Sequence, residues 1–119
     1  MVAGVWAELL GRARQEAEVE RKKVEARLKQ FSADVDLRNA EALSRDLGRV
    51  AAVHARYADV AIMTRPTEGA GVELREEIIE GVLFHSGRPA LIVPPNWKGA
   101  TIGKRVVVAW DASREATRA

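Results

Sequence analysis

The stretch DVAIMT at residues 59–64 decides the predicted fold, because it is a short apolar run that stops abruptly at Arg65-Pro66. Such a run is typical of a strand covered on both faces of a parallel sheet, and the residue before a proline is restricted to extended or turn geometry. A second run, PALIV at residues 89–93, is closed in the same way by Pro94-Pro95. We therefore expect two buried strands.

A helix is predicted between these strands, over residues 72–85. Its apolar residues recur at steps of three and four, and Gly87 stands where a C-terminal cap is expected. The apolar positions of this face are Leu74, Ile78, Ile79, Val82 and Leu83. Before the first strand, Ser44 is a candidate N-cap for a helix that ends near Arg56 or Tyr57.

The outer segments continue the alternation of helices and strands. Residues 105–110, RVVVAW, are a third β-branched run, and residues 33–38 alternate apolar and polar side chains as an edge strand does. One long amphipathic helix of ~35 Å is predicted from Trp6 to Phe31, part of which would project or pack on a second copy. The fold class is thus α/β, an open parallel sheet with flanking helices and right-handed crossovers.

Composition limits the function classes. The 119 residues are 47% hydrophobic and 30% charged, enough for one core with a solvated surface. Without cysteine there is no disulfide, thiolate metal site or cysteine nucleophile. Glu8 interrupts the apolar N-terminus too early for a signal core, and no run is long enough to span a bilayer, so we expect a cytoplasmic protein without a membrane partner.

The charges of the N-terminal segment indicate a solvated helix face. Residues 1–31 contain seven basic and five acidic side chains, and the whole chain has a net charge of only +2. Such a mixture is typical of ion pairs along a helix, so nucleic acid is not expected as a partner. Nucleic-acid binding through Arg21-Lys22-Lys23 remains a third hypothesis, and it predicts a steep dependence of binding on salt.

Three sequence blocks carry a family resemblance. HARYADV at residues 54–60 and VLFHSGRPALIVP at residues 82–94 resemble the second half of a universal stress protein domain. RVVVAWDASREATRA at residues 105–119 resembles the first strand and the following loop of another such domain. The resemblance implies an incomplete, Rossmann-like or flavodoxin-like domain at residues 1–95, a linker at 96–104 and the start of a second domain at 105–119.

The same resemblance implies a role in stress survival and dimerisation through the last strand of the domain. ATP-binding members carry the motif G-x2-G-x9-G-[ST], in which backbone amides surround the phosphates. In this chain the Gly-Ser pair falls on Glu76-Glu77, and the earlier glycines fall near Met63 and Pro66. Two carboxylates at a phosphate position repel a nucleotide, so we expect no ATP in this half.

Two glycines imitate part of this motif. Gly71 and Gly81 are separated by nine residues, but Gly81 is followed by Val82 and lies inside the predicted helix. Its amide is then already used by the helix, so we do not expect phosphate to bind there.

Asp111 and Ser113 are the candidate cofactor-binding residues. Asp111 follows the third apolar run, and the resemblance places it at the adenine-contacting position of a second domain. ATP binding there would need the downstream loop of a complete tandem protein. The competing interpretation is that Asp111 forms a turn and that Ser113 caps a helix.

No metal or catalytic site is predicted. His54 and His85 lie on different helices without a third ligand near either, with His54 on the inner face of its helix or at the edge of that face and His85 near a helix C-terminus. Glu76, Glu77 and Glu80 form a charged face with Arg75 on the helix at 72–85. They are explained by solvation and by the helix dipole, so we expect no enzyme.

The predicted interface residues are Trp97, Leu91, Val93 and Val107. Trp97 stands beside two prolines in the linker, where an exposed aromatic side chain is typical of a protein contact. Trp110 is explained equally well as an interface residue or as an ordinary core residue. The predicted core has two parts, the sheet and the helix that covers it. Its strand residues are Val60, Ile62, Leu91, Ile92 and Val93, and its helix residues are Ile78, Ile79, Val82 and Leu83.

An open slot is expected beside residues 60–63, and residues 106–110 are predicted to fill it, either within the chain or in a second copy. The leading functional hypothesis is a universal stress protein-like module of a bacterial-type stress response that binds no ATP in this half. It would act through protein association, as a homodimer or oligomer. The alternative is an ATP-binding member whose nucleotide site lies around Asp111.

Overall fold

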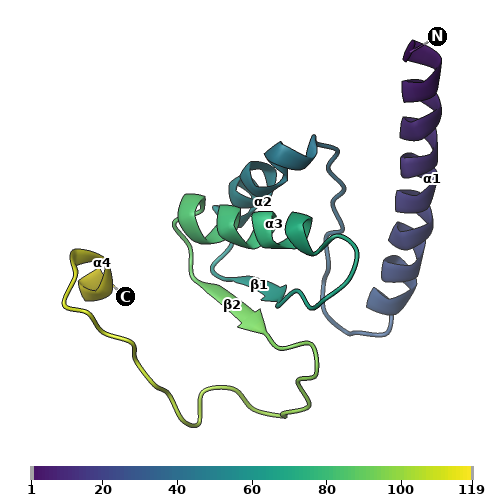
Figure 1. Cartoon of the computed structure of the whole chain (residues 1–119). Helices are drawn as coiled ribbons and strands as arrows, with labels where there is room; N and C mark the ends of the chain where they lie inside the picture. Colours follow the sequence, from purple (N-terminus) through teal and green to yellow (C-terminus); the bar gives the residue numbers. More distant parts are fainter. Residues whose placement is uncertain (1, 119) are drawn as a thin grey trace. The chain divides into compact units, whose positions relative to one another are not determined.

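The computed structural model describes residues 2–118. In chain order the elements are α1 (Val2–Leu28), a 3-10 helix (Ser44–Asp46), α2 (Leu47–Ala55), β1 (Ala61–Thr64), α3 (Val72–His85), β2 (Ala90–Val93) and α4 (Arg114–Arg118), as Figure 1 shows. The chain divides into two compact units, Met1–Glu41 and Ala42–Ala119. Each unit is described by itself.

The first unit is a single long helix followed by an extended segment. The predicted helix is confirmed, although α1 begins at Val2 and its last turn ends at Leu28. The predicted edge strand at residues 33–38 is wrong, because these residues have no regular structure. Alternation of side chains is not enough for a strand, since the backbone also needs a neighbouring strand to complete its hydrogen bonds.

The second unit contains α2 and α3. The prediction for α3 is confirmed at both ends, from Val72 to His85. Gly71 before it and Gly87 after it both have positive φ, 79° and 70°, a conformation that glycine adopts without steric cost. The predicted cap at Ser44 is wrong, because Ser44 starts the 3-10 helix and no side chain caps α2.

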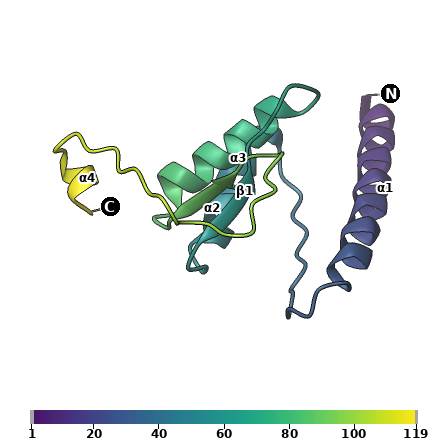
Figure 2. The same cartoon turned by 90° about the horizontal axis from the view of Figure 1, so that it is seen from below.

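The sheet has two parallel strands. Ala61 pairs with Ala90, and the register continues to Thr64 with Val93. Both predicted strands are confirmed in shorter form, with α3 as the crossover between them. Figures 1 and 2 both show α2 and α3 on one side of the sheet, so within the described part of the second unit no helix covers the other side. This arrangement is a partial α/β fold.

The prediction of a third strand is wrong. Residues 105–110 form no strand, and Val107 is 96% exposed. Trp110 is 60% exposed, so of its two interpretations, core residue or interface residue, the core interpretation is wrong. Residues with a high β propensity form a strand only where they pack on a sheet, and among the described residues this segment has no neighbouring strand. Folding back into the slot beside β1 is thereby contradicted, whereas exchange with a second copy stays a prediction.

The buried core is small and belongs to the two helices. Its buried hydrophobic residues are Ala52, Ala55 and Val82. Of the predicted core, Leu91, Val93, Ile78 and Ile79 are half-buried. The prediction is wrong for Val60, Ile62, Leu83 and Ile92, which are exposed. A two-stranded sheet covered on one face is too narrow to bury its own apolar residues. Among residues 2–118 no helix is both long and apolar enough to cross a membrane.

Candidate functional site

The two sequence blocks at residues 54–60 and 82–94 contact each other at the C-terminal ends of α2 and α3. Arg56 donates hydrogen bonds from Nε and Nη2 to the carbonyl oxygen of His85, at 3.3 and 3.2 Å. In return, Arg88 donates from Nε to the carbonyl oxygen of Arg56 at 3.0 Å. The last carbonyls of a helix have no partner within it, so these arginines complete both helix ends. The blocks therefore have a structural role.

The two histidines do not form a site. His54 is exposed, so it does not lie on the inner face of α2, and His85 contributes its backbone carbonyl to the arginine contact. Within residues 2–118, no group of three or more His, Cys, Asp or Glu side chains is arranged to hold a metal ion.

Gly81 lies where α2 crosses α3. A Cβ added at Gly81 would collide with the backbone of Gly48, and one added at Gly48 would lie 2.5 Å from the carbonyl oxygen of Glu77. Both glycines are buried. Sequence reasoning treated Gly81 only as part of an imitated phosphate motif. The close approach of two helix backbones explains this glycine, and its signal in the sequence is a second helical glycine at position 48.

The carboxyl ends of β1 and β2 are the place where open α/β sheets collect ligands. A hollow of about 530 Å³ lies there. Its lining comprises Arg65, Pro66, Thr67, Glu68, Pro94 and Pro95. Three of these six residues are prolines, which have no backbone N–H to donate, and Glu68 offsets the charge of Arg65. This lining favours a neutral or cationic group over a phosphate.

Three of the four glutamates of α3 line two shallow hollows. Glu76 and Glu80 lie with Arg65 and Ile79 around one of them, and Glu77 and Glu80 lie with Arg49 around the other. The predicted phosphate positions, Glu76-Glu77, thus fall in the helix itself and not in a glycine-rich loop before it. The repulsion of a nucleotide by Glu76 and Glu77 stays a prediction.

Asp111 and Ser113 form a helix cap. The amide of Ser113 donates to Oδ1 of Asp111 at 2.9 Å, and the amide of Ala116 donates to Oγ of Ser113 at 3.0 Å. The hydroxyl and the amide of Ser113 hold the pKa of Asp111 below its ordinary value. The structure thus confirms the capping interpretation. No strand precedes Asp111, so the strand end expected to place it at a ligand is missing.

Three of the four predicted interface residues come together beside β2. Leu91, Val93 and Trp97 line an apolar hollow of about 140 Å³ with Ile102. The Trp97 ring lies so close to Gly99 that a Cβ there would collide with it. Val107, the fourth residue, does not line this hollow.

The face of the sheet away from the helices is apolar and open. Ile62 is paired in register with Leu91, so both project from the same face. Ile92, one position further along the strand, projects from the opposite face, and it lines a hollow with Ile79 of α3. Ile62 is 66% exposed. This open face, defined by Ile62, Leu91 and Val93, is the candidate association surface.

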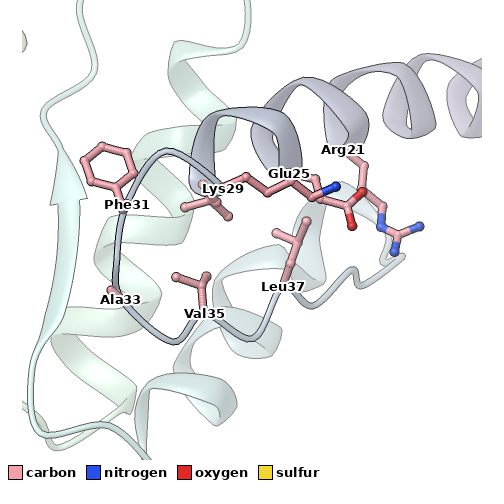
Figure 3. Close-up of a pocket in the computed structure, with 8 residues that line it drawn as sticks. Arg21, Glu25, Lys29, Phe31, Ala33, Val35 and Leu37 are labelled. Atoms are coloured by element: carbon pink, nitrogen blue, oxygen red, sulfur yellow. The ribbon is translucent and has the colours of Figure 1, made fainter.

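The first unit has a hollow of its own, which sequence reasoning missed because residues 33–38 were interpreted as a strand. Its volume is about 370 Å³. Figure 3 shows Val35 and Leu37 pointing from the extended segment toward α1, where Glu25 and Lys29 lie. An apolar floor beside charges of both signs has no feature specific to one ligand.

A bidentate ion pair joins α1 to the end of this segment. Arg14 donates from Nε and Nη2 to the two carboxylate oxygens of Glu41, at 2.9 and 3.0 Å. These hydrogen bonds, and then the positive charge, lower the pKa of Glu41.

We expect Arg14→Gln to raise the pKa of Glu41 to its ordinary value, measured by NMR titration of its side-chain carboxyl carbon. Because the folded-state pKa is depressed, the stabilisation by this pair is present above the unfolded-state pKa and is lost as the pH falls through the folded-state pKa. Arg12→Gln is the matched control, since Arg12 pairs with Glu8. An unchanged Glu41 titration in Arg14→Gln would show that the pair is not formed in solution.

No protein-family model, curated protein or solved structure matches this chain. The family resemblance of the three sequence blocks therefore stays a prediction.

Proposed function

We propose that this chain is a non-catalytic, universal stress protein-like module that acts in a stress response by associating with a second copy of itself. The observation that carries the proposal is the open face of the sheet, where Ile62 is 66% exposed and Leu91 and Val93 are only half-buried. Apolar surface left against water is stabilised when a partner covers it.

The backbone of the sheet supports the same proposal. A sheet of two four-residue strands has two free edges, and a two-stranded sheet is marginally stable by itself. A partner that covers the face or extends an edge would therefore stabilise the fold and form the complex at the same time.

The other two hypotheses have less support. Asp111 is engaged in the cap of α4, which does not favour a nucleotide contact. The basic side chains of α1 are partly paired with acidic neighbours, as in Lys23 with Glu20 at 2.6 Å and Arg21 with Glu18 at 3.5 Å. These ion pairs weaken the positive potential that a nucleic acid would need.

The proposal is tested by solution mass and by calorimetry on the same sample. Light scattering is expected to give twice the 13.1 kDa chain mass, and titration with Mg-ATP is expected to give no binding heat. Ile62→Glu places a charge on the open face and should shift the mass toward the monomer. Leu74→Glu is the control, because Leu74 is exposed on α3, on the helical side of the sheet. A monomer at every concentration, or saturable ATP binding, contradicts the proposal.

A further inference from the structure

Residues 105–110 are an unpaired strand-forming segment. Three consecutive valines are followed by alanine and tryptophan, a composition enriched in strands. Val106, Val107 and Val108 are 72%, 96% and 73% exposed. A β-branched segment left extended in water keeps its backbone groups available to a sheet edge.

The free edge of β1 is the matching acceptor. The amides of Ala61 and Arg65 donate to the carbonyls of Pro89 and Val93, at 2.9 and 3.0 Å, so these positions face β2. Backbone groups of alternate residues in a strand point to opposite sides, so the N–H and C=O groups of Ile62 and Thr64 point away from β2. Within residues 2–118 no backbone partner completes them.

The linker does not bring residues 105–110 to this edge in their own chain. Trp97 and Ile102 line one hollow with Leu91 and Val93 of β2. Three residue steps separate Ile102 from Arg105, the first residue of the segment, a span of at most ~11 Å. The slot beside β1 lies two strand spacings from β2, about 10 Å. Pairing within the chain would therefore require a fully extended linker, and the structure instead leaves Val106, Val107 and Val108 exposed.

We infer that residues 105–110 of one copy add as a third strand to the free edge of β1 in a second copy, and that the exchange is reciprocal. The inference rests on the proposed function and names the segment and the edge that make the association. A reciprocal exchange completes two edges per dimer and removes both valine segments from water. It also gives a closed dimer with two-fold symmetry, which does not grow further.

Engineered cysteines test the inference directly, because the chain has no cysteine of its own. One chain carries Ile62→Cys and an affinity tag, and the other carries Val107→Cys without a tag. The two are mixed, unfolded, refolded together and oxidised. A disulfide between tagged and untagged chains is the expected product. In the control, the tagged chain carries Ile92→Cys, on β2, in place of Ile62→Cys. This pair of chains should form much less of the disulfide between tagged and untagged chains.

A cross-link that forms mainly with Ile92→Cys would overturn the assignment to β1. A double variant carrying Ile62→Cys and Val107→Cys that closes its disulfide within one chain would overturn the exchange. A cross-link confined to the Ile62 pair and found between chains supports both parts of the inference.

A proline variant separates this inference from the proposed function. Val107→Pro removes a backbone donor in the middle of the exchanged strand and should weaken dimerisation by roughly tenfold or more. Thr101→Pro, in the linker, should leave it unchanged. If Val107→Pro dimerises as tightly as the unmodified chain, the exchange is wrong while association stands. If the unmodified chain is monomeric, both are wrong.

Discussion

Replacing Gly81 by alanine is expected to destabilise the second unit by about 2 to 3 kcal/mol, the cost of overpacking a closely packed contact. The added methyl group would collide with the backbone of Gly48, which cannot move aside as a flexible side chain would. Helix propensity alone predicts the opposite sign, since alanine in a helix interior is better than glycine by about 1 kcal/mol. The sign of the change therefore decides between the two effects.

Urea unfolding monitored by far-ultraviolet circular dichroism measures this change. Gly11→Ala is the matched control, because Gly11 also lies within a helix but has no atom within 4 Å of an added Cβ. It should leave stability unchanged or raise it slightly. Gly48→Ala should behave as Gly81→Ala does, since it faces the carbonyl of Glu77 across the same crossing. A Gly81→Ala protein as stable as the parent would mean that α2 and α3 do not cross as closely as described.

Replacing Val82 by aspartate is expected to cost about 4 kcal/mol or more and to leave the second unit largely unfolded at 37 °C. Val82 is 3% exposed, so the substitution buries a carboxylate in a small apolar core. Small domains have only about 5 to 15 kcal/mol of stability to lose. Loss of the cooperative thermal transition is the expected observation.

Leu83→Asp provides the comparison for this prediction. Leu83 is the next residue on α3 but is 45% exposed, so the carboxylate of an aspartate at this position would stay hydrated. We expect a loss of about 1 kcal/mol, which reflects reduced helix propensity and some lost apolar burial. Equal effects at positions 82 and 83 would show that the two side chains are buried to the same extent, which contradicts the described core.

Because the core is small, association is expected to stabilise the folded chain as well as to serve its function. The buried hydrophobic residues Ala52, Ala55 and Val82 are small side chains. Apolar burial stabilises in proportion to area, at about 25 cal/mol per Å². Covering the open face of the sheet, or adding residues 105–110 to its edge, would thus add a large fraction of the total stability. We expect the melting temperature to rise with protein concentration.

Local patterns predicted the elements that depend on local chemistry. The bounds of α3 follow from apolar residues at steps of three and four and from the flanking glycines Gly71 and Gly87. The ends of β1 and β2 follow from the prolines after them, which stop a strand through their own covalent geometry. The cap at Ser113 belongs to the same class, since its hydrogen bonds join residues two and three positions apart.

Contacts between distant residues decided the rest. Residues 33–38 and 105–110 have the alternation or composition of strands, but a strand exists only where a second segment pairs with its backbone. Ile62 would be buried only if another element covered its face of the sheet, and it is 66% exposed. The need for glycine at position 81 comes from Gly48, thirty-three positions earlier, whose backbone would collide with a Cβ there. The sequence by itself determined the bounds of α3 and the C-terminal ends of β1 and β2. Tertiary structure alone decided which faces are covered, because burial is a property of neighbours and not of a residue's own chemistry.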